Sequence, residues 1–420
     1  MMILVLALFI IFFLLILKYN KKIFQRTYVQ KPSNRLSTNA KGEWKWEMLK
    51  KTSRSFSIVI QELDKEIREV VCIFYLVLRA LDTVEDDMET IKDLEYKLDL
   101  LRRFHTLFSM QNDHKEQEEV VDDQDDGWYL KIDPIPVKGL FDIQRCGTNE
   151  NERKLVTEIK YLVEDFNKLS PKYQRVIIKI CAEMGKGMSE NVLKGEVNIQ
   201  NTKELDKYCY YVAGIVGVGL TELFVLSGLQ PKSLFDSMKK QSISMGLFLQ
   251  KTNIIRDIYE DVPENRIFWP SEIWGKYTDS PQELVKLSQS SYKLHKDKSL
   301  SCLNEMVTNA LQHIPDVLDY LKVIENNSIF KFCAIPQVMA IATLNEVTNN
   351  SKVFIQNVKI RRDLTLKIFH TTKNFEKTHS YFEHYREKLM KKIDLESFKS
   401  TKKQNEIFVN SPNRTEKKIF

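Results

Sequence analysis

The chain has 420 residues, and its 63 Lys and Arg residues against 57 Asp and Glu residues give a formal net charge of +6. A hydrophobic fraction of 43% can bury a large core, and with only 13 Gly and 11 Pro residues the chain excludes wholesale disorder and disfavours collagen-like and short-strand all-β architectures. So small a charge over this length also indicates no nucleic-acid partner, because such proteins gather basic residues on one face.

The first predicted element is an uninterrupted apolar run over residues 1–17. At about 1.5 Å per residue, a helix of this length spans roughly 25 Å, the short end of a membrane span. The alternative is a cleaved signal peptide, but no positive charge precedes the run and no small-residue cleavage site follows it. Because Lys18, Lys21, Lys22 and Arg26 follow directly, the positive-inside rule predicts a single-pass anchor with the rest of the chain in the cytosol.

Polar segments flank and interrupt the remaining chain. We predict that residues 18–42 are a basic and polar linker and that residues 394–420 are a Lys-rich, disordered tail. The tail ends in Lys-Lys-Ile-Phe (residues 417–420), which resembles the dilysine retrieval signal of endoplasmic reticulum membrane proteins. Residues 111–127 form an acidic insertion, and because they lack the spacing of a calcium-binding loop we expect a solvated loop.

Residues 43–393 are predicted to form one all-α catalytic domain. Apolar residues recur at spacings of three and four, and no segment alternates with period two for long enough to predict a sheet. Pro171 marks a helix start after Ser170, whereas Pro315 and Pro336 are expected to start or kink helices. The clearest periodic sets are Val70, Ile73, Phe74, Val77 and Leu81, and Leu311, Ile314, Leu318 and Leu321.

The six cysteines are scattered, and no two of them form a Cys-x-x-Cys pair. They therefore indicate neither a disulfide framework nor a thiolate zinc site, and they fit a reduced, cytosol-facing domain. These residues are Cys72, Cys146, Cys181, Cys209, Cys302 and Cys333.

Two segments carry carboxylates at positions i, i+3 and i+4. On a helix these positions share one face, so each segment presents three like charges to one side. Hard oxygen ligands suit Mg²⁺, with Mn²⁺ as an alternative ion, and Mg²⁺ also takes phosphate oxygens as ligands. One such segment is typical of a solvated acidic face, but two, each after an apolar run, favour a metal site. The predicted ligands are the first acidic motif (Asp82, Glu85 and Asp86) and the second acidic motif (Asp257, Glu260 and Asp261).

Further polar residues are predicted on the same helix faces. The segments that carry them are too apolar for surface helices, so we expect the polar groups to face a cavity. Arginine is the side chain best suited to bind a diphosphate through several N–H groups. The residues are Tyr75 and Arg79 before the first motif, and Gln250, Asn253 and Arg256 before the second.

Together these residues predict a helical cavity with two facing Mg²⁺–carboxylate sites and additional arginines. This arrangement suits the ionisation of an allylic diphosphate, in which Mg²⁺ neutralises the leaving group and a dry aromatic pocket holds the carbocation. The chain has 23 Phe and 16 Tyr residues to supply such a pocket, although most of them must belong to the core.

Five blocks of the sequence resemble the squalene synthase family of head-to-head isoprenoid synthases, and with their spacing they cover about residues 45–390. The resemblance implies the all-α isoprenoid synthase fold. It also implies that two farnesyl diphosphates condense to presqualene diphosphate with loss of a proton, and that NADPH then reduces this intermediate to squalene. The blocks are Thr52–Phe56, Val71–Met88, Tyr208–Thr221, Ser244–Ile258 (followed by Phe268–Pro270) and Phe330–Asn345.

The family's functional residues carry over to matching positions. The resemblance implies that Tyr208 assists proton removal and that Phe332 shields a cation; by its pattern alone, Tyr208 would be a packing residue. The predicted catalytic residues are Tyr75, Tyr208 and Phe332; the predicted substrate-binding residues are Ser53, Arg54, Ser55, Arg79, Gln250, Asn253 and Arg256; the predicted NADPH-binding residues are Arg54, Arg79, Arg256, Lys359 and Arg361.

Gly214, Gly217 and Gly219 do not spell a dinucleotide-binding loop, and no strand is predicted before them. We therefore expect close helix packing at these glycines and NADPH binding without a Rossmann unit, as the resemblance implies.

Several features depart from the family pattern. The family's usual anchor is C-terminal, whereas the apolar run here is N-terminal, and the acidic insertion is additional. Residues 262–265 replace a Gly-containing loop, and Tyr259 replaces a usual Leu. None of these changes removes a predicted ligand, but the loop change could alter lid closure or product release.

Two alternatives stay open. A phytoene- or dehydrosqualene-type synthase would stop before reduction, but the block at residues 332–336 and the pair Lys359 and Arg361 favour the reducing enzyme. A non-catalytic membrane scaffold with the same fold would not need six carboxylates facing a cavity, so the intact acidic motifs disfavour it. The sequence names no protein partner and no oligomeric state.

Overall fold

The computed structural model describes residues 40–53, 56–87, 89–108, 127–192 and 199–393. The predictions for the anchor, for Arg54 and Ser55, for nearly all of the acidic insertion and for the tail concern residues outside these ranges. By its internal contacts the chain divides into two units, Met1–Glu43 and Trp44–Phe420. The fold described below is that of the second unit.

The described residues are helical throughout and contain no β-strand, which confirms the predicted all-α class. Short 3₁₀ helices and one π-helix, η3, interrupt the α-helices. In chain order the elements are α2 (Ala40–Ser53), α3 (Phe56–Gln61), α4 (Lys65–Asp86), α5 (Leu94–Arg103), η1 (Phe104–Phe108), η2 (Trp128–Lys131), α6 (Val137–Ile143), α7 (Glu150–Thr157), α8 (Ile159–Phe166), α9 (Pro171–Val192), α10 (Thr202–Cys209), η3 (Tyr210–Gly214), α11 (Ile215–Leu226), α12 (Lys232–Ser237), α13 (Lys239–Arg256), α14 (Ile258–Asp261), α15 (Ser271–Trp274), α16 (Pro281–Gln289), α17 (Lys293–Leu311), α18 (Ile314–Lys322), α19 (Asn327–Val347), η4 (Ser351–Phe354), α20 (Arg362–Thr371) and α21 (Phe375–Ile393).

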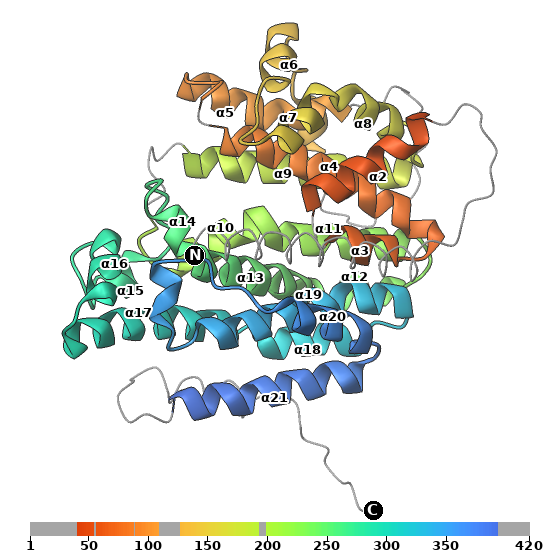
Figure 1. Cartoon of the computed structure of the whole chain (residues 1–420). Helices are drawn as coiled ribbons and strands as arrows, with labels where there is room; N and C mark the ends of the chain where they lie inside the picture. Colours follow the sequence, from red (N-terminus) through yellow and green to blue (C-terminus); the bar gives the residue numbers. More distant parts are fainter. Residues whose placement is uncertain (1–39, 54–55, 88, 109–126, 193–198, 394–420) are drawn as a thin grey trace, which may run out of the picture. The chain divides into compact units, whose positions relative to one another are not determined.

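Two groups of helices build the core of this unit. In the first group α4 packs against α7, α8 and α9, and in the second α13 packs against α17, α18 and α19. Helix α11 contacts α4, α9 and α13 and so joins the two groups (Figure 1). The first acidic motif lies at the end of α4 and the second at the end of α13, so each group supplies one motif.

The apolar periodicity predicts the buried face of α4 correctly. Every residue of the predicted set from Val70 to Leu81 is buried, because positions three and four apart share one side of a helix. Helix α9 begins at Pro171, as predicted from its fixed φ and missing N–H.

The second periodic set does not form one helix. Leu311 ends α17, and Ile314 begins α18 with Pro315 as its second residue. Proline lacks an N–H and disfavours helical geometry in the residue before it, so the chain breaks there. Pro336, in contrast, lies inside α19, which continues through it.

Close approach of α13 to α11 and to η3 depends on glycine. A Cβ added to Gly217 would lie 2.1 Å from the carbonyl oxygen of Ser242, and one added to Gly246 would lie 2.2 Å from that of Ala213. Neither position has room for a side chain. The structure therefore confirms the predicted close helix packing at this glycine cluster.

Two helical runs within the described ranges are long and apolar enough to cross a membrane, Thr202–Leu226 and Asn327–Val347. Both pack inside the helical unit, α11 against α9 and α13, and α19 against α13 and α21. Core helices pass the same test of length and composition, so we describe both runs as part of the core.

All six cysteines are buried and unpaired. Burial raises the pKa of every one of these thiols, for Cys146 and Cys209 to about 12. The predicted absence of a disulfide framework agrees with this arrangement.

Candidate active site

The first acidic motif lies on the last turns of α4, which stays helical through Asp86. Burial and then the neighbouring carboxylates of the motif raise the pKa of Asp82 to about 7 and that of Glu85 to about 8. The pKa of Asp86 is also raised, mainly by burial. Asp82 and Asp86 nevertheless keep 31% and 29% of their side chains exposed, so these crowded carboxylates remain accessible to a ligand.

Lys97 of α5 binds the C-terminal end of α4. Its buried Nζ donates to the backbone carbonyls of Glu85 and Asp87, at 2.7 Å each. A helix C-terminus has unsatisfied carbonyls and a negative dipole end, so a cation is favoured there. The Asp87 carboxylate accepts from the backbone N–H of Thr90 at 2.7 Å and of Gly147 at 2.9 Å. The first motif is therefore fixed from outside its own helix.

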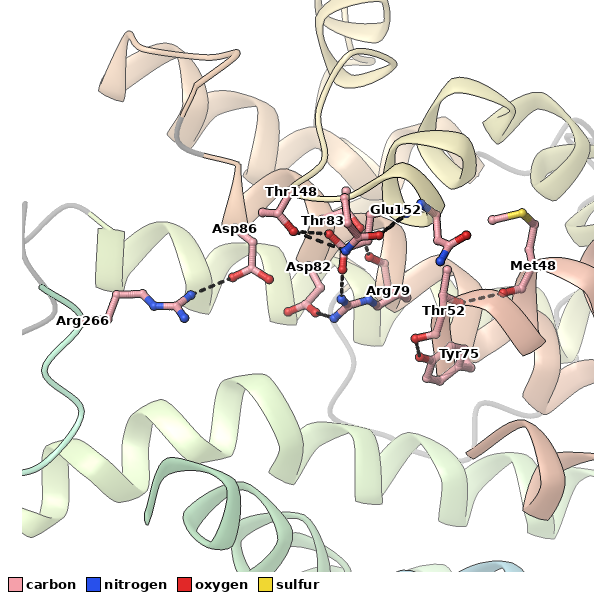
Figure 2. A network of polar contacts seen from close by, with 12 residues as sticks. Met48, Thr52, Tyr75, Arg79, Asp82, Thr83, Asp86, Thr148, Glu152 and Arg266 are labelled. Atoms are coloured by element: carbon pink, nitrogen blue, oxygen red, sulfur yellow. Dashed lines mark hydrogen bonds and ion pairs between the residues drawn. The ribbon is translucent and has the colours of Figure 1, made fainter. Parts of the chain in front are cut away.

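Arg79 connects the first motif to α7 (Figure 2). Its Nη1 donates to Asp82 and its Nη2 donates to Glu152. Glu152 also accepts from the Thr148 hydroxyl at 2.5 Å. One turn earlier on α4, the Tyr75 hydroxyl donates to the backbone carbonyl of Thr52 at 3.2 Å, and burial raises the pKa of Tyr75 to about 12.

The second acidic motif begins where the helix geometry is irregular. Helix α13 ends at Arg256, Asp257 has φ −95° and ψ 8°, and the four-residue α14 follows. Arg256 turns back onto Asp257 through two contacts, Nε–Oδ1 at 2.6 Å and Nη2–Oδ2 at 2.5 Å. Pro263 follows soon after α14 and disfavours further helix. Helical hydrogen bonding nevertheless passes through Asp257, because the Asp257 N–H donates to the Asn253 carbonyl at 2.9 Å and the Asp257 carbonyl accepts from the Asp261 N–H at 3.0 Å. That all three carboxylates share one helix face stays a prediction for this motif.

The three carboxylates of the second motif have separate partners. Asp257 pairs with Arg256, whereas Glu260 is exposed and accepts from the Asn357 side-chain amide at 2.6 Å. Asp261 is buried, and burial raises its pKa to about 7.

Arg266 links the two acidic motifs, and Figure 2 shows its contact with Asp86. Its Nη1 lies 3.4 Å from Asp86 Oδ1, and its Nη2 lies 2.9 Å from Asp261 Oδ1. The loop before it turns at Asn265, which has φ 59°, a left-handed conformation that asparagine tolerates better than most residues. Two carboxylates 175 positions apart in the sequence thus face one guanidinium. This arrangement brings the two motifs to one site.

Tyr208 lies beside the first motif. The pKa of its phenol is raised well above 10, by burial and then by the charges of Glu85, Asp82 and Asp86. Its ring packs on Phe268, with centroids 4.9 Å apart. The π-helix η3 begins two residues later, and such turns are frequent at functional sites.

The remaining predicted site residues differ in burial and in their contacts. Phe332 is buried and packs edge-on against Phe224 at 6.0 Å. The Ser53 hydroxyl is buried and donates to the Leu49 carbonyl at 2.5 Å. On α13, Gln250 is half-buried and Asn253 is exposed.

Lys359 and Arg361 are exposed and lie in the segment between η4 and α20. Arg361 pairs with Asp363 at 3.3 Å. The contact between Asn357 and Glu260 places the start of this segment against the second motif. Lys359 and Arg361 thus follow, a few positions along the chain, a residue that contacts the second acidic motif.

The donors present fit Mg²⁺ in their chemistry. Within the described part of the chain, no group of three or more His, Cys, Asp or Glu side chains is arranged to hold a metal ion by itself. Mg²⁺ usually takes one or two carboxylates, several waters and substrate phosphates rather than an all-protein cage. Burial is the first cause of the raised pKa values in the first motif, and for Asp82 and Glu85 the neighbouring carboxylates add to it; a divalent cation would stabilise the ionised carboxylates.

Sequence reasoning missed three residues that organise the site, Lys97, Glu152 and Arg266. A partial signal existed for Glu152, because Asn149 precedes it by three positions in the pattern of a helix N-terminus; the Asn149 side chain does accept from the Glu152 N–H at 3.1 Å. Arg266 follows a turn-forming segment, which carries no periodic signal. Lys97 carried no distinguishing sequence signal, because charged residues are common in amphipathic helices.

Comparisons with known proteins agree with this geometry. The model of the squalene/phytoene synthase family matches residues 49–364. Squalene synthase ERG9 of Candida albicans is 44% identical over 77% of this chain and 65% of its own length, so this chain spans slightly less than two thirds of that relative. Squalene synthase of Rattus norvegicus is 40% identical over 88% of this chain and 78% of its own length.

Solved structures show the same fold. TcSQS in complex with the ligand E5700 is 38% identical, has a TM-score of 0.75, and the match covers 89% of this chain and 98% of that one. A dehydrosqualene synthase in complex with a ligand has a TM-score of 0.52 at 17% identity, over 82% of this chain and 97% of that one, which supports the fold alone.

Proposed function

This chain belongs to the squalene/phytoene synthase family, and from that premise we propose that it is a squalene synthase. Two molecules of farnesyl diphosphate condense head to head to presqualene diphosphate, and NADPH reduces this intermediate to squalene. The single observation that carries the proposal is the pairing of both acidic motifs with Arg266. This chemistry needs two clusters of carboxylates at one site, close to cationic side chains.

The first and second acidic motifs would hold Mg²⁺, or Mn²⁺, which neutralises the diphosphate that leaves. Glu260 is the member of this set with the weakest support, because it is exposed and bound to Asn357. Arg79, Arg256 and Arg266 already pair with carboxylates of the motifs and can bind diphosphate oxygens through their remaining N–H groups.

Tyr208 keeps its proton at Oη in this site, because burial and three nearby carboxylates raise its pKa. A neutral phenol beside the leaving group can donate a hydrogen bond to a developing negative charge. The resemblance assigns Tyr208 to assisting removal of the proton lost in the first half-reaction. Because the phenol keeps its own proton, we assign it the positioning of the group that accepts that proton, by donating a hydrogen bond to it. Tyr75, one turn before Arg79 on α4, is a second neutral phenol, because burial raises its pKa to about 12.

The reductive half-reaction rests on the family resemblance. Lys359 and Arg361 would bind the NADPH phosphate, with Arg54, Arg79 and Arg256 closer to the diphosphate, and Phe332 would shield a cation. Ser53, Ser55, Gln250 and Asn253 complete the proposed substrate contacts. The 40–44% identity to proteins named squalene synthase favours this reducing assignment over a dehydrosqualene-type product.

The apolar residues 1–17 would anchor the enzyme in the endoplasmic reticulum membrane, with the catalytic domain (43–393) in the cytosol. Protease treatment of intact microsomes should then digest the catalytic domain. Complete protection of that domain would contradict this orientation.

The decisive experiment is product analysis of the full-length protein in detergent with farnesyl diphosphate, Mg²⁺ and NADPH. We expect squalene, with presqualene diphosphate or dehydrosqualene only when NADPH is withheld. If those two products alone form with NADPH present, the reducing assignment is wrong. If no prenyl diphosphate is consumed under any condition, a non-catalytic scaffold replaces the proposal.

A further inference from the structure

We propose that Glu152, on α7 and outside both acidic motifs, is a positioning residue that aims Arg79 at the first acidic motif. This inference rests on the proposed function, since the motif and Arg79 are taken as the diphosphate site. Glu152 lies 73 positions after Arg79 and on a different helix. Figure 2 shows the Arg79 guanidinium between Asp82 and Glu152, with Thr148 on the far side of Glu152.

Exposure increases along this chain of contacts. The side chain of Glu152 is 8% exposed, that of Arg79 is 25% exposed and that of Asp82 is 31% exposed. Among these three contacting residues, the buried end is thus the acid Glu152, and the accessible end is Asp82, a predicted metal ligand. The accessible carboxylate is the one that can exchange its partner when a ligand arrives, whereas the buried one pairs with no cation other than Arg79 among the residues that the structure describes.

Glu152 is itself held in place. Its Oε2 accepts from the Thr148 hydroxyl at 2.5 Å, and its backbone N–H donates to the Asn149 side chain at 3.1 Å. Hydrogen bonds from Thr148, the charge of Arg79 and the contact with Asn149 lower its pKa, although burial alone would raise it. It is therefore an ionised, fixed acceptor for one end of the guanidinium.

The consequence concerns Arg79 when Asp82 binds a cation. Arginine has a planar fork of N–H donors, and one edge fixed by Glu152 leaves the other edge directed at the position of Asp82. When Asp82 turns to a cation, the guanidinium stays oriented and can donate to a diphosphate oxygen instead. Without Glu152, Arg79 would be free to follow the Asp82 carboxylate or to leave the site.

The test uses full-length protein and two matched substitutions, Glu152→Gln and Glu158→Gln. Glu158, at the end of α7, accepts from the Trp44 indole N–H at 2.7 Å and contacts neither acidic motif. Outer partners of functional ligands typically affect affinity or activity by about 10- to 100-fold, so we expect a loss of that size in kcat/KM for farnesyl diphosphate in Glu152→Gln. Glu158→Gln should match the unmodified enzyme, and Glu152→Asp should recover part of the loss.

A second readout is independent of turnover. Isothermal titration calorimetry with inorganic diphosphate and Mg²⁺ should show weaker binding for Glu152→Gln than for Glu158→Gln, and thermal melting should show whether both variants fold. If Glu152→Gln does not fold, Thr148→Val, which removes one donor to Glu152, should give a smaller loss in the same two measurements.

A double-mutant cycle with Arg79→Lys separates positioning from general stability. If Glu152 acts through Arg79, the effect of Glu152→Gln should nearly vanish in the Arg79→Lys background. Additive effects, or a loss no larger than that of Glu158→Gln, would overturn the inference. If the unmodified enzyme consumes no farnesyl diphosphate, the proposed function fails instead, and the binding measurements still test Glu152.

Discussion

The two acidic motifs have the same spacing in the sequence but differ in structure. On α4 the helix continues through all three carboxylates, and burial followed by the neighbouring carboxylates raises the pKa of Asp82 and Glu85. At the end of α13 the helix is irregular at Asp257, and each carboxylate of the second motif has a partner of its own. The first motif is thus a concentrated negative charge, and the second is a distributed one.

This difference shows that identical spacing does not fix identical chemistry. An unbroken helix keeps like charges together and gives a strong site for a cation. In the second motif, arginine and asparagine side chains already compensate the charges. We therefore expect the first motif to depend more strongly on a divalent cation, and the predictions below test that asymmetry.

The largest expected effect is on turnover in Asp82→Asn. Removing one preorganised charge from an electrostatic site typically costs about 10²–10³-fold in rate, and we expect a loss of that size. Helical circular dichroism should stay unchanged, and product formation with saturating Mg²⁺ is the measurement. Activity within a few-fold of the unmodified enzyme would mean that the first motif does not bind the catalytic cation.

The middle position of the two motifs gives a matched pair, Glu85→Gln and Glu260→Gln. Glu85 lies within the charge cluster, whereas Glu260 is exposed and bound to Asn357. We expect a loss of about 10- to 100-fold for Glu85→Gln and little change for Glu260→Gln. Equal losses in kcat/KM would show that the two motifs are equivalent despite the irregular geometry at Asp257.

Arg266→Gln should affect both motifs at once, because Arg266 pairs with Asp86 and Asp261. Without its charge, the pKa of each of these carboxylates should rise further. We expect a raised Mg²⁺ requirement for turnover, seen as a higher half-saturating Mg²⁺ concentration, with Lys substitution giving a smaller change. An unaltered Mg²⁺ dependence would show that Arg266 does not couple the motifs electrostatically.

The smallest expected effect is on thermal stability without divalent cations. The folded-state pKa is raised to about 7 for Asp82 and Asp261 and to about 8 for Glu85. The native state therefore binds more protons than the unfolded state between about pH 5 and 8, so stability falls as pH rises through this window. In EDTA we expect Tm to be about 1–3 °C higher at pH 6 than at pH 8.

Asp82→Asn is the control for that measurement. Since it removes one buried charge and the repulsion it causes, it should raise Tm at pH 8 and reduce the difference between the two pH values. A larger difference than in the unmodified protein would contradict the assignment of the raised pKa values to the first motif.

Sequence alone was enough for the helical class, the buried face of α4 and the glycine contacts between α11 and α13. These features follow from local periodicity and from the absence of a side chain, which the sequence states directly. The link through Arg266 does not follow from periodicity, because it depends on which distant side chain a charged group meets. The same holds for Glu152, whose partner Arg79 is on another helix.

The buried thiols described above have a practical consequence for spectroscopy. Maleimides react with exposed thiolates. A buried thiol with a raised pKa is neither exposed nor ionised at neutral pH, so it does not react readily. The natural chain is therefore already a suitable background for site-directed labels, without removal of its own six cysteines. Probes introduced through Glu89→Cys and Tyr259→Cys, both at exposed positions near the ends of α4 and α13, would report how far apart these two ends lie as Mg²⁺ and diphosphate bind.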